Sequence, residues 1–283
     1  MASATQEAPD APASVPAERS PRRELLGGAI VIALFLSAAC LGDAVYIEPF
    51  RLQVTHYDLK APVFAPLKIA QLSDLHTHGM RRNEKHMLQI LNQEKPDAIV
   101  ITGDCLGNLA GNYEWCKQLY QQLHAPLGVW FVHGNWENDR PVHREKQFYR
   151  EAGINLLVNA NVQLRPNVWL IGLDDPSSGW PRPDIALAGV PQDAYKIAIF
   201  HSPGYFRRMA GRVNLCLAGH THGGQVRIPF VKPFWLPHGA KPYLEGWYEM
   251  KGSKMYVSRG IGMSNLQIRF LCRPEISFFT LHP

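Results

Sequence analysis

Two histidines one residue apart stand in the segment Gly219-His220-Thr221-His222-Gly223-Gly224-Gln225, directly after the apolar run 215–218. Glycine adopts backbone conformations that other residues avoid, so the flanking glycines let the chain bend and turn both imidazoles toward one point. Imidazole is a common metal ligand. Alone, such a pair is as often two histidines with ordinary protein or solvent partners, so a metal site requires further ligands elsewhere.

Four other segments end an apolar run with side chains that can ligate a metal through oxygen or imidazole nitrogen: 68–76, 97–104, 128–135 and 195–201. Their apolar runs are short and rich in Ile and Val, which is the pattern of strands buried on both faces. Open α/β sheets build their sites at the carboxyl ends of their strands. Five predicted strand ends thus supply seven candidate metal ligands: Asp74, His76, Asp104, Asn135, His201, His220 and His222.

The order Asp-x-His, Gly-Asp, Gly-Asn, a lone His and Gly-His-x-His resembles the calcineurin-like metallophosphoesterases, and the resemblance covers residues 50–283. The segments 219–225, 256–262 and 273–276 are similar to the membrane-associated or exported bacterial branch. That branch includes phosphodiesterases and, among its relatives, enzymes that cleave the pyrophosphate of UDP-diacylglucosamine. The resemblance implies a metal-dependent hydrolase of phosphodiester or pyrophosphate bonds with a two-sheet α/β/β/α sandwich fold.

Carried over position by position, the family pattern assigns the ligands to two ions: Asp74, His76 and His222 to one, Asn135, His201 and His220 to the other, with Asp104 bridging them. Phosphoesters are anionic and repel nucleophiles, so two cations about 3.5 to 4 Å apart favour hydrolysis by neutralising the phosphoryl oxygens and holding a bridging hydroxide in line. Mixed imidazole and oxygen ligands suit two divalent transition-metal ions, Mn, Zn or Fe, rather than Ca or Mg.

The sequence departs from the family pattern at Trp136, where a histidine normally follows the Gly-Asn pair. That histidine usually protonates the leaving oxygen, and a general acid contributes roughly a hundredfold to ten-thousandfold to the rate. Tryptophan cannot transfer a proton at neutral pH. His78 and His133 are two possible substitutes, although a solvated loop residue and a packed strand residue are the favoured interpretations.

The catalytic residues therefore stay unassigned at this stage. A substrate with a good leaving group would need no acid, as when a nucleoside phosphate departs from a pyrophosphate. The alternative from another functional class is a catalytically impaired scaffold or sensor that binds metal without turnover. The complete set of seven metal ligands argues against such decay.

Apolar periodicity predicts the elements between the ligand segments. Helices over 83–92, 113–123 and 144–152 would alternate with the first strands, and this βαβ alternation implies a parallel sheet covered by helices. In the second half, strands are separated by longer Gly/Pro loops, which indicates a second sheet packed on the first. These strands are 168–174, 195–201, 215–220, 254–257 and 276–281.

The N-terminus differs in composition from the remainder of the chain. Residues 1–24 are rich in Ala, Pro and Ser without an apolar period, so we expect a disordered tail. Residues 25–42 carry no charge and as a helix would span about 27 Å, enough for a transmembrane anchor or an export signal. Arg19, Arg22 and Arg23 flank this span, which places the tail in the cytoplasm and the catalytic domain outside it.

Composition narrows the range of partners. With 46% apolar residues in 283, the chain can bury one large core, so one catalytic domain is expected over 50–283. The net charge of +5 favours anionic phosphoesters, but no basic cluster interleaved with aromatic residues predicts nucleic-acid binding. Aromatic residues near 177–183 and 229–249 would form either an apolar entrance or a packed loop core. An entrance close to a membrane makes a lipid-linked substrate reasonable.

Overall fold

The computed structural model describes residues 21–77, 79–107, 112–138, 142–233 and 235–283, and these form two compact units that meet in the chain between Leu41 and Gly42. The first contains all but the last residue of helix α1 (Pro21–Gly42), which begins four residues before the predicted span. The stretch Leu25–Phe50 is long and apolar enough to cross a membrane, and its most apolar window contains no buried residue. A signal sequence near an N-terminus meets the same criteria.

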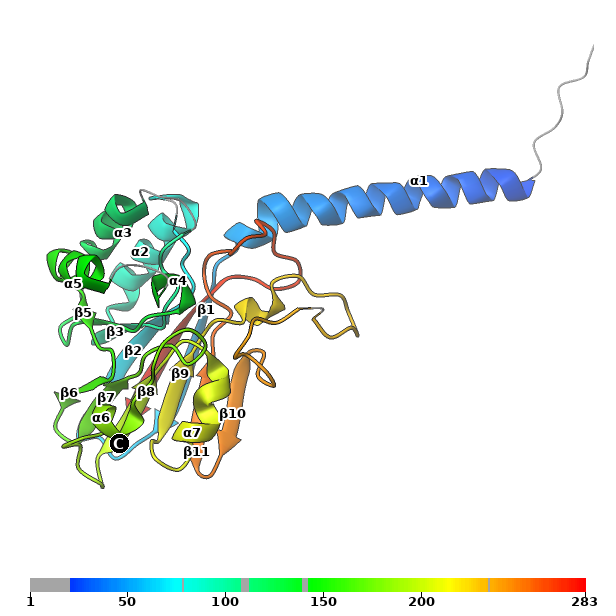
Figure 1. The fold of residues 1–283 in the computed structure, drawn as a ribbon. Coiled ribbons are helices and arrows are strands. Elements are labelled where there is room, and N and C mark those ends of the chain that lie inside the picture. The colour runs from blue at the N-terminus through cyan, green and yellow to red at the C-terminus, as the bar shows by residue number, and fades with distance from the viewer. Residues whose placement is uncertain (1–20, 78, 108–111, 139–141, 234) are drawn as a thin grey trace, which may run out of the picture. The chain divides into compact units, whose positions relative to one another are not determined.

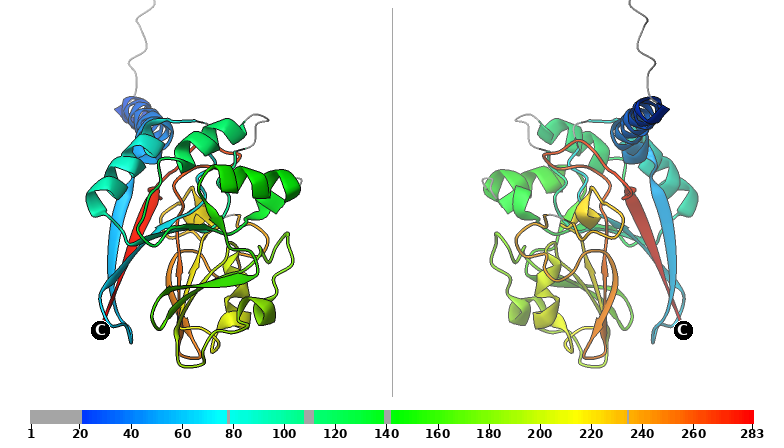
Figure 2. Two further views of the ribbon diagram at one scale, coloured as in Figure 1. Left: turned by 90° about the vertical axis from the view of Figure 1, so that its left-hand side faces the viewer. Right: turned by 90° about the vertical axis from the view of Figure 1, so that its right-hand side faces the viewer.

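The larger unit, Gly42–Pro283, opens with a π-helical turn (Asp43–Ile47) and a 3-10 turn (Glu48–Phe50). Its first sheet has the order β1 (Gln53–Lys60), β12 (Glu275–His282), β2 (Leu67–Leu72), β3 (Ala98–Ile101), β4 (Val129–Phe131), β5 (Asn155–Leu156). All neighbours are parallel except β12 and β2. Figure 2 shows β12 (red) beside β1 (light blue).

The connections of the first sheet are the helices α2 (Arg82–Glu94), α3 (Asn112–Tyr120) and α5 (Val142–Glu151), with the short α4 (Asn135–Asn138) after β4. They lie on one face of this sheet (Figure 1). A buried cluster including Met87, Tyr120 and Phe131 fills the space between helices and strands. The three longer helices correspond to those predicted from apolar periodicity.

The second sheet has the order β10 (Gly246–Met250), β11 (Ser253–Val257), β9 (Leu215–Ala218), β8 (Tyr195–Ile199), β7 (Val168–Gly172), β6 (Ala160–Arg165). Its four central strands are parallel, and β10 and β6 are antiparallel to their neighbours. The short elements α6 (Pro183–Ala186), Pro203–Tyr205 and α7 (Phe206–Met209) accompany this sheet, and a 3-10 turn, His222–Gly224, follows β9.

Three layers of buried side chains show how the sheets pack. One lies between the helices and the first sheet. A second joins the facing sheets through residues such as Ile69, Leu170 and Phe279, and a third packs Phe206 of α7 against the second sheet. The predicted two-sheet α/β/β/α sandwich is confirmed.

The C-terminal strand lies in a different sheet from the one that was predicted. The segment 276–281 was expected with the strands of the second sheet, but β12 lies in the first sheet between β1 and β2. Its partners are more than 200 residues away in the sequence, and local apolarity carries no information on them. The edge strands β1, β5, β6 and β10 were not predicted, because they lack the continuous run of buried apolar residues that the central strands have.

Candidate metal centre

The seven predicted ligands follow five strands, three in the first sheet and two in the second. Asp74 and His76 follow β2, Asp104 follows β3, and Asn135 opens α4 after β4. His201 follows β8, while His220 and His222 follow β9. Each of these strands ends at the same edge of the sandwich, so both sheets contribute to one site.

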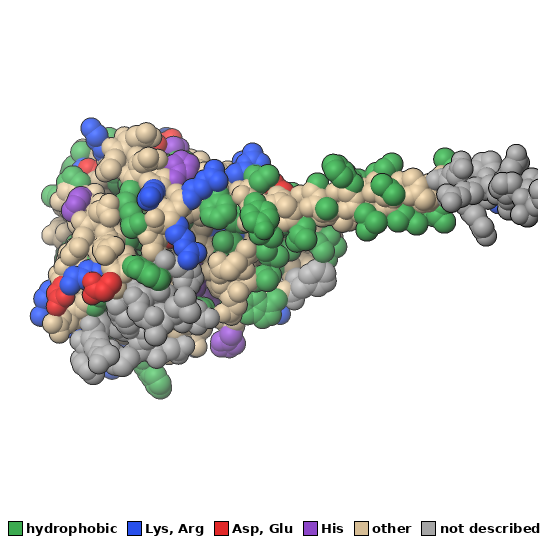
Figure 3. Space-filling view, turned by 90° about the horizontal axis from the view of Figure 1, so that it is seen from above, with side chains coloured by type: hydrophobic (Ala, Val, Ile, Leu, Met, Phe, Trp, Pro, Cys, Tyr) green, Lys and Arg blue, Asp and Glu red, His purple; other side chains and the backbone are tan. Residues whose placement is uncertain are grey.

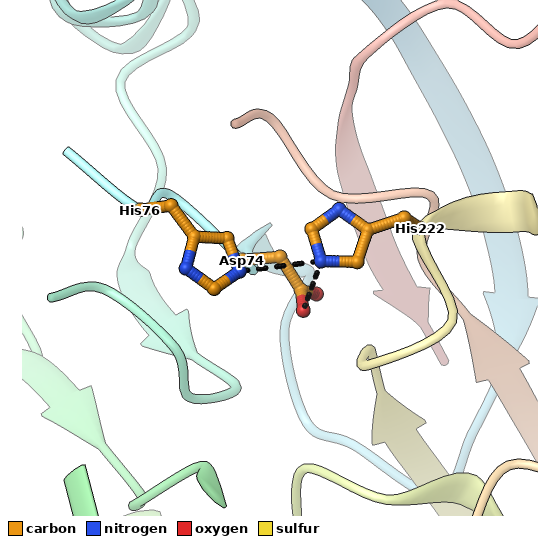
Figure 4. A group of neighbouring side chains, drawn as sticks. All are labelled: Asp74, His76 and His222. Carbon is orange, nitrogen blue, oxygen red and sulfur yellow. Dashed lines mark hydrogen bonds and ion pairs between the residues drawn. The ribbon is translucent and has the colours of Figure 1, made fainter. Parts of the chain in front are cut away.

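The first ligand group consists of Asp74, His76 and His222, whose ligating atoms lie within 4.8 Å of one another. The Nε2 atoms of the two imidazoles are 3.2 Å apart, and His222 Nε2 is 3.4 Å from Asp74 Oδ1. All three side chains are buried and point toward a common position (Figure 4). The group matches the set that the resemblance assigned to one ion.

The second ligand group consists of Asp104, His201 and His220. His201 Nε2 lies 3.1 Å from Asp104 Oδ2 and 2.9 Å from His220 Nδ1. The same Asp104 oxygen is 3.8 Å from Nε2 of His76, a member of the first group. Asp104 thus faces both groups, as a carboxylate shared by two cations would.

Hydrogen bonds to the backbone fix two of the imidazoles. His201 Nδ1 donates to the Thr102 carbonyl at 2.7 Å, and His220 Nε2 donates to the His238 carbonyl at 2.8 Å. A carbonyl oxygen can only accept, so these ring nitrogens carry the protons. In a neutral imidazole the other nitrogen then presents its lone pair to the site, the arrangement that orients histidine ligands in metalloproteins.

Asn135 adjoins both groups. Its Oδ1 is buried and finds no hydrogen-bond partner among the described residues. Asn135 lines a cavity of about 400 Å³ together with Asp104, His220 and His222. Leaving a buried amide oxygen unpaired is costly, and a cation in the cavity would satisfy it. The side chains present therefore fit two metal ions.

Burial and mutual charge set the protonation of these groups. Burial lowers the pKa of His76, and lowers the pKa of His222 to about 3, so both imidazoles are neutral at pH 7 and able to ligate. Burial alone would raise the pKa of Asp104, but His201 and His76 hold it below its ordinary value. Asp104 is consequently a carboxylate.

The backbone of the site is held in an unusual conformation. Five of the seven ligands have φ between 39° and 72°, in the left-handed region: Asp74, His76, Asp104, His220 and His222. Such a conformation costs of order 1–3 kcal/mol per residue and persists only where the surroundings impose it. Glycines allow the required close approaches, since a Cβ on Gly134 would lie 2.1 Å from Asp104 Oδ1, and one on Gly219 would lie 1.9 Å from Ser73 Oγ.

Glu137 joins the two loops that carry Asp104 and Asn135. Its fully buried carboxylate accepts four backbone N–H groups. Oε2 accepts from Asp104 and Gly134, each at 2.8 Å, and Oε1 accepts from Cys105 at 3.0 Å and Leu106 at 3.2 Å. Burial and the Asp104 carboxylate raise the pKa of Glu137 to about 7, while the N–H donors oppose that rise. No role was predicted for Glu137, although it follows the Gly-Asn pair of the ligand pattern by two positions.

The side chains considered as proton donors lie in different places. Trp136 lines the cavity, its ring is edge-on to His76 at 4.8 Å, and its backbone N–H donates to Asp104 Oδ1 at 3.0 Å.

His133 is buried beside the rings of Phe131 and Tyr149 and does not line this cavity. His78 lies outside the described residues. His238, for which no role was predicted, does line the cavity.

Of the loop aromatics for which an entrance and a packed loop core were the alternatives, Trp235 lines the cavity above the ligands. Trp180 lines a separate surface pocket, and Trp247 and Tyr248 belong to β10. Phe234 lies outside the described residues. The cavity wall is thus only partly aromatic, and it also presents polar side chains such as Ser177 and Asn265.

Residues 67–224 match the model of the calcineurin-like phosphoesterase family. The chain belongs to this family. It is 32% identical to the metallophosphoesterase YkuE of Bacillus subtilis over 92% of this chain and 97% of that protein. It is 30% identical to the phosphodiesterase YaeI of Escherichia coli over 93% of this chain and 99% of that protein. These matches confirm the family identified from the ligand motifs, and metal-dependent phosphoester hydrolysis is the activity of that family.

Proposed function

We propose that this metallophosphoesterase holds two divalent transition-metal ions and hydrolyses a phosphodiester or pyrophosphate bond at the outer surface of a membrane. One observation supports the dinuclear site above the others: Asp104 Oδ2 lies 3.1 Å from His201 Nε2 and 3.8 Å from His76 Nε2, between the two ligand groups. The name of the relative YaeI, a phosphodiesterase, agrees with the proposed bond class.

When bound, two such ions supply charge neutralisation of the phosphoryl group and an activated water molecule. The chain supplies the positions. Thr102 and His238 orient two imidazoles through their carbonyls, and Glu137 fixes the loop of Asp104 against that of Asn135. The ring of Trp136 closes one wall of the cavity.

Among the described histidines beyond the ligands, His238 is the one that we assign to protonate a departing oxygen, because it lines the same cavity as Asp104, His220 and His222. Imidazole transfers protons near neutral pH, whereas the indole of Trp136 does not. In the proposed reaction, His238 thus acts as the general acid, in place of the family's histidine at the position that Trp136 occupies. Nucleotide-linked and lipid-linked phosphoesters are the two substrate classes that we propose.

The proposed location follows from the apolar stretch Leu25–Phe50 and from the arginines that precede it. A helix of this length serves as an anchor, and Arg22 and Arg23 favour a cytoplasmic N-terminus. The larger unit would then be extracytoplasmic.

Hydrolysis of bis-p-nitrophenyl phosphate by the purified full-length chain, with Mn, Zn or Fe added, tests the activity. Asp104→Asn should abolish turnover and reduce bound metal from two ions to one or fewer, because the charge shared by both ions is lost. Asp58→Asn, which changes an exposed carboxylate, is the matched control and should behave as the wild type.

Two results would contradict the proposal. Two tightly held ions in Asp104→Asn, measured by elemental analysis, would remove Asp104 from its bridging role. A wild-type protein that binds two ions but remains inactive across metals and pH would favour the scaffold or sensor.

A further inference from the structure

Two loops of the larger unit expose apolar side chains to an unusual degree. The loop between β9 and β10 carries Phe230, which is 109% exposed relative to a reference residue, and Trp235, which is 70% exposed. The loop between β11 and β12 adds two exposed leucines. We name the set of six exposed apolar residues on these loops the apolar rim: Ile228, Phe230, Val231, Trp235, Leu266 and Leu271. Single exposed apolar residues are common, but gathered patches mark interaction surfaces.

Direct hydrogen bonds hold the two loops together. Arg227 N donates to the Phe270 carbonyl at 2.9 Å, and Phe270 N donates to the Gln225 carbonyl at 3.0 Å. The Gln225 side chain also donates to the Leu266 carbonyl. The two loops lie at the same end of the larger unit in Figure 1, where they are gold and orange-red. The apolar rim is therefore one surface and not two unrelated loops.

This surface lies where the chain enters the larger unit from its apolar helix. Arg269, in the second loop, donates its backbone N–H to the Ala44 carbonyl at 3.0 Å. Ala44 belongs to the π-helical turn that follows α1, and Tyr46 and Ile47 of that turn are themselves exposed. A bilayer that held the apolar stretch Leu25–Phe50 would therefore begin within a few residues of the apolar rim.

Charge also favours a membrane surface. Residues 223–244 and 260–274 contain no Asp or Glu, and their basic residues include the exposed Lys232 and Lys241. Figure 3 shows hydrophobic side chains gathered among lysine and arginine side chains on the face of the larger unit seen from above. Aromatic and aliphatic groups flanked by basic residues are typical of surfaces that bind the interface of anionic bilayers.

We propose that the apolar rim is a membrane-docking surface, which inserts Phe230 and its neighbours into the interfacial layer of the bilayer that holds the N-terminal helix. Trp235 of the rim, and Ser264 and Asn265 beside it, line the cavity above the metal ligands. Docking thus brings the mouth of that cavity against the lipid head groups. This inference rests on the proposed membrane anchor and is independent of the phosphoesterase chemistry.

Photo-crosslinking of the full-length chain in vesicles of phosphatidylcholine and phosphatidylglycerol tests the docking surface. Benzoylphenylalanine replaces Phe230 in one variant and Phe64 in the other, and lipid adducts are measured by mass spectrometry. Phe64 is the matched control, because it is 83% exposed but lies in the loop after β1, at the opposite end of that strand from Phe50. We expect at least tenfold more adduct at position 230.

Equal adduct yields at the two positions, in protein that floats with the vesicles, would overturn the docking surface and leave the anchor intact. A chain that does not float with the vesicles would overturn both. Hydrolysis of bis-p-nitrophenyl phosphate by the same samples reports on the catalytic proposal separately. Adducts confined to position 230 support docking whether or not that hydrolysis is observed.

Discussion

Glu137→Gln should lower the free energy of unfolding of the larger unit by about 2–6 kcal/mol. Each carboxylate oxygen of Glu137 accepts two backbone N–H groups, so an amide NH2 in place of either oxygen leaves two buried N–H groups facing a donor. Each buried donor without an acceptor costs about 1–3 kcal/mol. Glutamine also avoids the cost of burying a charge, so we expect a loss in the free energy of unfolding near the lower end of the range of about 2–6 kcal/mol.

The measurement is urea unfolding of the full-length protein at pH 8, above the pKa of about 7 that burial gives Glu137. The urea concentration at the midpoint of unfolding should fall. The slope of the free energy of unfolding against urea concentration should not change. Bound metal should fall as well, since Glu137 holds the backbone of Asp104 through a 2.8 Å hydrogen bond. If Glu137→Gln lost stability but still bound its full content of metal, Glu137 would stabilise the fold without supporting the candidate metal centre.

Glu84→Gln is the matched control. Glu84 is also buried, but its partners are the Thr77 hydroxyl at 2.8 Å and the backbone N–H of Arg81 at 3.2 Å. A hydroxyl can accept as well as donate, so glutamine can satisfy both partners and should cost little. Wild-type stability in Glu137→Gln, or an equal loss in Glu84→Gln, would refute the reasoning.

Two further predictions concern topology and the proton donor. Alkaline phosphatase fused after Pro283 should be active in a bacterial host, since the proposed topology, inferred from the arginine flank, has the larger unit outside the cytoplasm; an active cytoplasmic reporter at that position would reverse the topology. If His238 supplies the proton, His238→Ala should slow alkyl phosphodiesters at least tenfold more than nitrophenyl diesters, and Trp136→His should restore part of the loss. His133→Ala is the control, and the same selective loss in that variant would assign the acid to His133 instead.

The strands that carry the ligands could be predicted from the sequence because their signal is local. Runs such as Ile99-Val100-Ile101 are buried on both faces, and each ends a few residues before one that can bind metal. The family pattern adds the order of these residues. The ligand groups found around Asp74 and Asp104 required no knowledge of loop structure, since strand ends alone bring them together.

Strand order in the first sheet could not be predicted in the same way. β12 pairs with β1 in parallel and with β2 in the antiparallel sense, across sequence separations of more than 200 residues. Its apolar pattern reveals burial on both faces but not which strands cover its edges. The pairing of strands so distant in the sequence depends on how the two sheets pack as a whole.

The sequence does not reveal how the supporting residues hold the site, because their hydrogen bonds involve backbone atoms. Glu137 binds N–H groups of residues 104–106, which lie 31 to 33 positions earlier, and any sequence offers those donors. Thr102 and His238 orient imidazoles through carbonyl oxygens that every residue possesses. Side-chain identity therefore predicts the ligands, whereas the tertiary fold alone identifies what holds them.

The loop after β9 connects the metal centre with the proposed membrane surface. The His238 carbonyl accepts the hydrogen bond of the ligand His220, and Trp235, three residues earlier, belongs both to the cavity wall and to the apolar rim. Docking of this loop would therefore act on the residues that line the cavity and on the hydrogen bond that orients His220. With Trp136 in the position of the family's histidine, the proposed proton donor lies not in α4 but in the loop after β9, so its position depends on the conformation of that loop.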